Sequence, residues 1–383
     1  MSLLDLPNEL LASLPCYLDN IESFMNMASS CRRLRENFAK TSPRTILQLA
    51  AASAPTFFSP HPHFLVMAVA RQVSDWAIKG KENTRKFREA LQGGIEGFYD
   101  FCINSEEVKA GLTMDDIRRL HLSRFSIINP FADQIDKMAG SQWYETPRFW
   151  NGGVSEPATL YTDSNRAAFQ IIIYGELFGS SMNAFLEPEK QLPYFDVDTR
   201  LDYFKYCVPD VMCSSYAGME VLDVGPYVDR EALQDEDQVA LQHIFTCHRW
   251  RRMWKEGMKK VGKLFSSDTV WGYVTNDNEE PWKLKVYRDA LQTQGLEGMQ
   301  IVTLPPDKIS KESLEKGMEI RQRVLSLPGP FPSRRIGTRL QAPVSEAPDP
   351  GQEMQESPSF KLSRVGVAIR FVVDNGHAAQ FTF

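Results

Sequence analysis

The spacing of apolar side chains constrains this chain more than any other feature. Such residues recur every three or four positions from residue 44 to 326, which places them on one face of successive helices. No sequence repeat of 20–50 residues accompanies them, which argues against a solenoid or a propeller. We therefore expect a mainly α fold, with strong helices at 63–78, 82–103 and 163–185.

Polar residues and prolines predict where further helices start and stop. Thr113 followed by Asp116 is a capping pattern that starts a helix, and Pro130, which has no backbone N–H, is expected to interrupt it. Residues 235–238 open what should be the longest helix, running to about Phe265. Shorter helices are expected at 199–207, 280–294 and 308–325. Residues 44–326 thus form one large, irregular helical domain.

The C-terminal part differs in composition. Residues 327–359 contain seven prolines among glycine, serine and charged residues. A segment of this kind cannot bury enough apolar surface to offset its ordering entropy, so we expect a disordered linker. Alternation from Val365 to Val373, followed by Asn375-Gly376, then predicts a small β-hairpin in the tail 360–383. A lone hairpin is marginal in water, so it should dock on the helices, pair with another strand or be poorly ordered.

Composition limits the broad class. The 383 residues are 43% hydrophobic, enough for two or three domains or one large helical one. A net charge of -6 provides no global reason to bind nucleic acid or an anionic membrane. The six cysteines show no tight pairing, so we expect reduced thiols. Without a signal peptide or a run of about 20 apolar residues, a cytoplasmic or nuclear chain is expected.

The first of three short helical segments in residues 3–40 starts at Pro7, where a missing N–H is harmless. Pro15 lies inside this segment and clashes with the Leu11 carbonyl, which costs about 3 kcal/mol in a regular helix. We therefore expect a kink or break near Leu14. Its apolar stripe comprises Leu6, Leu10, Leu11, Leu14 and Leu18.

Two further helices are expected to complete this N-terminal segment. Asp19 and Glu22 form a capping pattern for the second, and Ser30 can cap the third. Their apolar residues are Ile21, Phe24, Met25, Ala28, Cys31, Leu34 and Phe38. Three short helices within about 45 residues cannot make a self-sufficient core. The rest of the chain or a partner must therefore cover them.

The segment from Leu4 to Leu11, the pair Tyr17-Leu18 and the segment from Cys31 to Arg35 resemble an F-box in order and spacing. F-box proteins bind the Skp adaptor, which bridges to a cullin scaffold in a ubiquitin ligase. The resemblance covers about a tenth of the chain and implies an F-box at 1–43. The adaptor-facing and core positions that it implies are Leu4, Leu6, Pro7, Leu10, Leu11, Leu14, Leu18, Phe24, Cys31 and Leu34.

The remainder is similar, more loosely, to fungal F-box proteins with uncharacterised helical C-terminal regions, through residues 201–210 and 224–227. This similarity implies that residues 44–326 recruit an unknown protein substrate. The alternatives are an N-terminal hairpin that only completes the helical domain, and an adaptor-binding scaffold outside any ligase.

A basic, aromatic helix at 249–263 is a second candidate interaction site. Arg249, Arg252 and Lys255 can bind nucleic acid, a phosphorylated peptide or a calmodulin-like partner. Alternatively, its apolar residues form a core stripe and its basic residues a solvated face that complements the helix dipole. The core stripe would comprise Trp250, Met253, Trp254, Val261, Leu264 and Phe265.

Metal and catalytic chemistry have little support. His243 and Cys247 lie one helical turn apart and His248 follows, but structural zinc needs four ligands. His61-Pro62-His63 is better interpreted as a turn before a helix than as a ligand pair. No phosphate loop, nucleophile elbow or zinc-protease motif is present. We therefore expect a non-catalytic chain without metal or cofactor.

Overall fold

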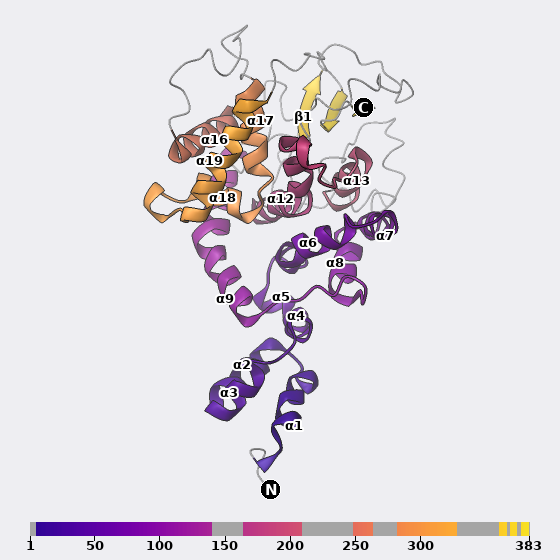
Figure 1. The fold of residues 1–383 in the computed structure, drawn as a ribbon, viewed down its shortest axis with the longest axis vertical. Coiled ribbons are helices and arrows are strands. Elements are labelled where there is room, and N and C mark those ends of the chain that lie inside the picture. Colours follow the sequence, from indigo (N-terminus) through magenta and orange to yellow (C-terminus); the bar gives the residue numbers. More distant parts are fainter. Residues whose placement is uncertain are drawn as a thin grey trace.

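The computed structural model describes residues 5–139, 164–208, 248–262, 282–327, 360–365, 368–373 and 377–382. Helices make up most of the first four ranges, which confirms the mainly α fold. The N-terminal helices lie at one end of the molecule, and the largest group of helices lies at the other (Figure 1).

The N-terminal bundle consists of α1 (Asn8–Ser13), α2 (Ile21–Ser30) and α3 (Arg32–Phe38). The expected break before Pro15 is confirmed, because α1 ends at Ser13 and a 3₁₀ turn follows over Leu14–Tyr17. A proline fits the first positions of such a turn, where its missing N–H has no partner to lose.

Two predicted caps of this bundle are wrong. Asn20, not Asp19, caps α2, because its side chain accepts a 2.8 Å hydrogen bond from the Ser23 N–H. Ser30 donates its hydroxyl back to the Met27 carbonyl and so ends α2. Cys31, with an extended backbone and no side-chain cap, precedes α3.

The middle of the molecule contains α4 (Pro43–Ala52), α5 (Ala54–Phe57), α6 (His63–Ala77), α7 (Lys81–Gln92) and α8 (Gly94–Asn104). The prediction for 63–78 is confirmed to within one residue. The single stretch 82–103 is instead two helices. Gly94 separates them with φ +73°, a left-handed conformation that favours glycine.

The next helix changes its winding where the sequence predicts an interruption. The Thr113–Asp116 capping box that starts α9 (Met114–Ser123) is confirmed. A π-helical turn over Arg124–Ile128 then leads directly into α10 (Asn129–Ala139). Pro130 thus lies in the first turn of α10, so it coincides with altered winding and not with an end of the helix.

The longest described helix, α12 (Ser164–Leu186), is the centre of the core. Fifteen of its 23 residues are buried, so neighbours must surround it on most sides. The helix α6 lies along it, and the Ser74 hydroxyl donates a 2.6 Å hydrogen bond to the Leu177 carbonyl. The helices α10, α17 (Trp282–Gln292), α18 (Leu296–Thr303) and α19 (Lys311–Ser326) also contact it.

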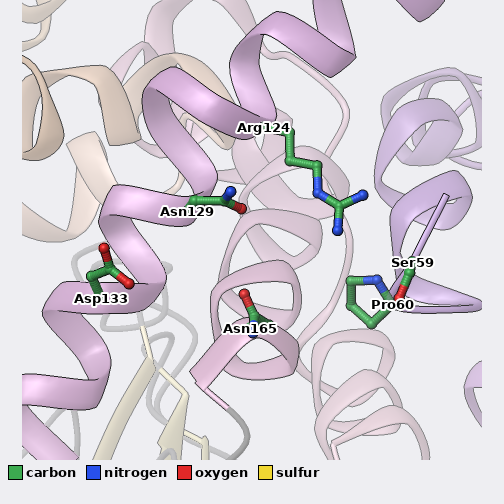
Figure 2. A pocket seen from close by; sticks show the side chains of 6 residues that line it. All are labelled: Ser59, Pro60, Arg124, Asn129, Asp133 and Asn165. Carbon is green, nitrogen blue, oxygen red and sulfur yellow. The ribbon is translucent and has the colours of Figure 1, made fainter. Parts of the chain in front are cut away.

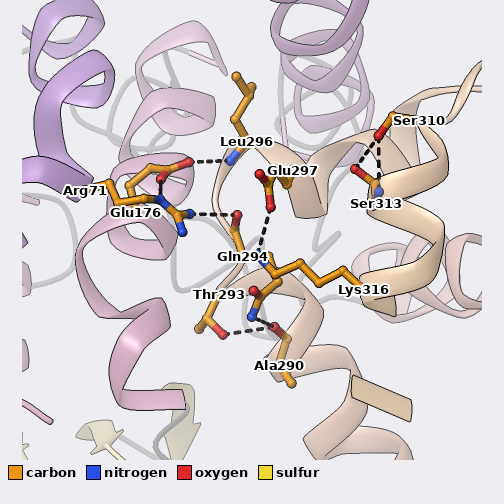
Figure 3. Close-up of polar contacts among 10 residues, drawn as sticks. All are labelled: Arg71, Glu176, Ala290, Thr293, Gln294, Leu296, Glu297, Ser310, Ser313 and Lys316. Atoms are coloured by element: carbon orange, nitrogen blue, oxygen red, sulfur yellow. Dashed lines mark hydrogen bonds and ion pairs between the residues drawn. The ribbon is translucent and has the colours of Figure 1, made fainter. Parts of the chain in front are cut away.

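A polar junction fixes the turn between α17 and α18 against α6 and α12 (Figure 3). Arg71 Nε donates to Glu176 Oε2 at 2.7 Å, and the Leu296 N–H donates to Glu176 Oε1 at 2.9 Å. Gly295 has φ +63°, and a Cβ there would collide with the Glu176 side chain. Burial lowers the pKa of Arg71, but the Glu176 carboxylate outweighs it, so the pKa is raised.

The remaining described elements are 3₁₀ turns over Pro188–Lys190 and Pro306–Lys308, α13 (Val197–Asp202), a π turn over Tyr203–Cys207, α16 (His248–Val261) and three strands. The predicted start of the longest helix at 235–238 and the Pro-rich segment 328–359 lie outside the described residues. Predictions for 163–185, 280–294 and 308–325 are confirmed as α12, α17 and α19. The helix α18 had no predicted counterpart.

The strands β1 (Phe360–Val365), β2 (Ala368–Val373) and β3 (His377–Thr382) form an antiparallel sheet in the order β1-β2-β3. Phe360 pairs with Val373, which in turn pairs with His377. The expected hairpin tail stays a prediction, because its Asn375-Gly376 turn lies outside the described residues. Among the helices that are described, none is both long and apolar enough to cross a membrane.

Candidate partner-binding surface of the N-terminal bundle

The bundle α1–α3 has a small core of its own. Leu11, Phe24 and Leu34 are at most 3% exposed, and the Phe24 and Phe38 rings lie 5.0 Å apart between centroids. Around this core pack Leu6, Leu14, Leu18 and Cys31, all partly buried. Of the implied adaptor positions, the three buried ones therefore support any binding surface from beneath. Leu4 lies outside the described residues.

Large apolar side chains are exposed on the same bundle. Leu10 is 52% exposed, Tyr17 80% and Met25 50%, and Pro7 is also exposed. We call Leu10, Tyr17 and Met25 the exposed apolar set. Isolated exposed apolar residues are ordinary, but three within residues 5–40 are a marked concentration. Of the eight large apolar side chains exposed in the described parts of the chain, these are three.

The sequence pointed to Leu18, not Tyr17 or Met25, as a candidate. The 3₁₀ turn before Leu18 explains the difference, because it winds more tightly than an α-helix and shifts which residue faces outward. Tyr17 was part of the quoted motif, so the signal for it was present. Met25 was assigned to the apolar face of the second helix.

Arg33 ties the start of α1 to α3. Its Nη2 donates to the Leu6 carbonyl at 2.9 Å, and both Nε and Nη2 donate to Asn8 Oδ1 at 3.2 and 3.1 Å. Arg33 belongs to the motif segment from Cys31 to Arg35, but nothing in the sequence indicates this contact. The two ends of the bundle are therefore held together by polar contacts as well as by the core.

The bundle joins the body through α4. The Pro43 carbonyl accepts a 2.9 Å hydrogen bond from the Leu112 N–H, and Gln72 exchanges two hydrogen bonds with the Gly111 backbone. A Cβ at Gly111 would lie 2.7 Å from Pro43, so only glycine allows this approach. The helix that carries the bundle is thus fixed to both α6 and the start of α9.

The basic helix α16 packs by its aromatic side. Trp250, Trp254 and Val261 of the predicted core stripe are at most 6% exposed and Met253 is half-buried, whereas Leu264 and Phe265 lie outside the described residues. Met258, which was not part of the predicted stripe, is also buried. Arg252 and Lys255 are exposed, whereas the side chain of Arg249 lies outside the described ones. Lys260 donates to the Leu304 carbonyl at 2.9 Å and so caps α18. Figure 1 places α16 at the end of the molecule opposite α1–α3.

The histidines near residue 60 are packing residues. His63 begins α6 and is buried, and the His61 ring lies edge-on to Tyr99 with centroids 4.8 Å apart. Burial, aided by the charge of Arg166, holds the pKa of His63 near 3, so it is neutral. In the parts that the structure describes, no three His, Cys, Asp or Glu residues lie together as metal ligands would.

The chain matches no family model, no curated protein and no solved structure. The sequence and the geometry of the N-terminal bundle are therefore the only indications of its function.

Proposed function

We propose that this chain is the substrate-recruiting F-box subunit of a Skp–cullin–F-box ubiquitin ligase, working in the cytoplasm or nucleus. In this proposal residues 3–40 bind the Skp adaptor, and the helical body carries a protein substrate. The observation that supports it most is the exposed apolar set on a small bundle at one end of the molecule.

The energetics favour a covering partner. Fully burying a side chain of the size of leucine or methionine stabilises a complex by about 1.5–3 kcal/mol. Leu10, Tyr17 and Met25 are half exposed or more, so at least about half of that contribution is unused in the chain alone. The F-box resemblance supplies the chemical identity of the partner, which exposure cannot supply.

The proposed contribution to ubiquitin transfer is proximity. A receptor that holds its substrate beside the ubiquitin-loaded subunits raises the effective concentration of the substrate lysine, without side-chain chemistry of its own. The proposal therefore requires no catalytic residue, metal or cofactor in this chain.

Co-purification with the Skp adaptor tests the proposal. The variant Leu10→Glu/Tyr17→Ala/Met25→Glu should lose adaptor recovery while its thermal unfolding stays that of the native chain. A matched control is Leu122→Glu/Tyr194→Ala/Met318→Glu, because these residues are 65%, 64% and 43% exposed and lie in the body. The control should recover the adaptor normally.

Leu11 is unsuited to this test, since it is fully buried and its truncation would disturb the bundle itself. Failure of the native chain to recover the adaptor, where another F-box protein succeeds, would contradict the proposal. Recovery of adaptor without any cullin would favour the scaffold alternative.

A further inference from the structure

A polar pocket of about 470 Å³ lies in the body, lined by Ser59, Pro60, Arg124, Asn129, Asp133 and Asn165 (Figure 2). One wall is the continuous helix formed by α9, the π turn and α10. The opposite wall is the loop before α6 together with the first turn of α12. A volume of this size lies within the range of about 300–1,000 Å³ that is usual for ligand sites.

The π turn aligns the charged wall of the pocket. The Asn129 N–H bonds to the Arg124 carbonyl, five residues back, so the wider winding turns these two residues toward the same side of the helix. In an α-helix, with about 3.6 residues per turn, a residue five positions on would face well away. Asp133 follows Asn129 by four residues and shares its face. The altered winding thus helps to bring Arg124, Asn129 and Asp133 to one wall of the pocket, and single-turn π segments occur often at functional sites.

Within the described residues, the three side chains on this wall make no side-chain hydrogen bond or ion pair. In the described residues, neither Arg124 nor Asp133 has an ion-pair partner, and the Asn129 amide has no hydrogen bond. By contrast, Arg118 and Arg119 on α9 pair with Asp115 and Asp116 at 2.7 and 2.8 Å. The Arg124 guanidinium lies over the Phe64 ring, 5.8 Å from its centroid, which restrains it without neutralising it.

The arrangement has opposite charges at its two ends and an amide between them. A carboxamide offers both a donor and an acceptor, which is what a peptide backbone requires. Nine residues separate Arg124 from Asp133, so at about 1.5 Å per residue their backbones are roughly 13 Å apart. An extended peptide covers that distance in about four residues, and side chains at even spacing face the same side.

We infer that this pocket binds an extended segment of a protein substrate, with an acidic side chain at Arg124 and a basic side chain four residues away at Asp133. The inference rests on the proposed function in that a substrate receptor needs such a site. Asn129 would hydrogen-bond the peptide backbone between the two charges.

A direct test uses fluorescence polarisation with the full-length protein and labelled nonapeptides built from glycine, serine and alanine. One peptide carries glutamate and lysine four residues apart. A second carries them three apart, and a third has lysine at both positions. The first should bind at concentrations up to about 1 mM and the other two at least about tenfold more weakly.

Two pocket variants and two matched controls make the test specific. Arg124→Gln and Asp133→Asn should each weaken binding of the first peptide by at least about tenfold. Arg118→Gln and Asp115→Asn, on the same helix but outside the pocket, should leave binding unchanged. Arg124→Glu should transfer the preference to the peptide with two lysines.

No binding of the first peptide, equal binding of all three, or unchanged binding by Arg124→Gln and Asp133→Asn would each overturn the inference. Adaptor recovery by Arg124→Gln separates this result from the proposed function. If the native chain binds the peptide but no adaptor, the pocket stands and the ligase proposal falls. If the native chain recovers the adaptor but binds no peptide, the ligase proposal stands and the pocket inference falls.

Discussion

The central helix α12 and the bundle α1–α3 are both rich in apolar side chains, but they differ in how far those side chains are buried. Fifteen of the 23 residues of α12 are buried, because α6, α10 and α17–α19 surround it. The bundle has helices of 6, 10 and 7 residues and contacts the body mainly through α4. The body buries most of α12 among its own helices, although five large apolar side chains elsewhere in the body are exposed. The much smaller bundle leaves the exposed apolar set uncovered. A structure of the second kind is suited to a partner.

The largest expected effect comes from the cores. Phe24→Ala in the bundle should cost about 3–5 kcal/mol, and Ile172→Ala in α12 about 2–5 kcal/mol. Because the bundle depends on few contacts, Phe24→Ala should abolish hydrogen-exchange protection in 5–40 and leave that of α12 unchanged. Ile172→Ala should lower the unfolding midpoint of the whole body.

Met25→Ala is the control for Phe24→Ala, since its side chain is half exposed and should change stability by less than about 0.5 kcal/mol. If Phe24→Ala also removes protection from α12, the two regions unfold as one unit and the contrast drawn between them is wrong.

A smaller effect is expected at the junction inside the body. Glu176→Gln removes the charge that pairs with Arg71 and weakens the acceptor of the Leu296 N–H. Because the Arg71 side chain is 46% exposed, we expect a loss of about 1–2 kcal/mol in the free energy of unfolding. Urea unfolding measures it, and the exposed Glu189→Gln is the control.

The corresponding polar contact of the bundle, between Arg33 and the start of α1, should contribute less to stability. Arg33→Gln loses hydrogen bonds to Leu6 and Asn8, which are worth about 0.5–1.5 kcal/mol at an exposed site. The expected result is faster amide exchange in α1 with no change in the body. Arg35→Gln removes a neighbouring exposed guanidinium and should have no effect. An equal response from both variants would show that the Arg33 contact adds nothing.

The smallest effect is a pH dependence at the start of α9. Burial raises the pKa of Asp116, but hydrogen bonds from Thr113 and the charge of Arg119 outweigh it and lower the pKa. The Asp116 carboxylate therefore contributes to the free energy of unfolding above its unfolded-state pKa of about 3.9. This contribution is lost as the pH falls through the folded-state pKa.

Asp116→Asn should accordingly cost about 0.5–1 kcal/mol at pH 7 and nothing once the carboxyl of the native chain is protonated. Unfolding midpoints of both proteins at neutral and acidic pH give the difference. Asp115→Asn, whose side chain is 89% exposed, is the control variant.

Strong apolar periodicity predicted the fold well. The expected helices at 63–78 and 163–185 match α6 and α12 to within one residue, because long amphipathic or apolar stretches allow few alternatives. The break at Gly94 and the Asn20 cap were missed, since both depend on a single backbone conformation. Propensity does not distinguish Asn20 from Asp19 as a cap.

The bundle surface and the pocket differ in how far each can be predicted from the sequence. The bundle is local, so its motif and its break at Pro15 could be predicted from residues 3–40. The pocket combines the loop at 59–60 with residues 124–133 and 165, which are distant in sequence. It also depends on a π turn, for which the chain has no recognisable sequence signature.

The hydrogen bonds at Pro43, Gln72 and Gly111 have a geometric consequence. They fix the orientation of the bundle relative to the body. In the proposed function, a substrate held by the body would therefore be presented to an adaptor-bound scaffold at a constant separation and angle. If the proposed function holds, inserting a few glycines after Lys40 should preserve adaptor and substrate binding and remove that alignment. Ubiquitin would then be expected on more lysines of the substrate, each at a lower rate.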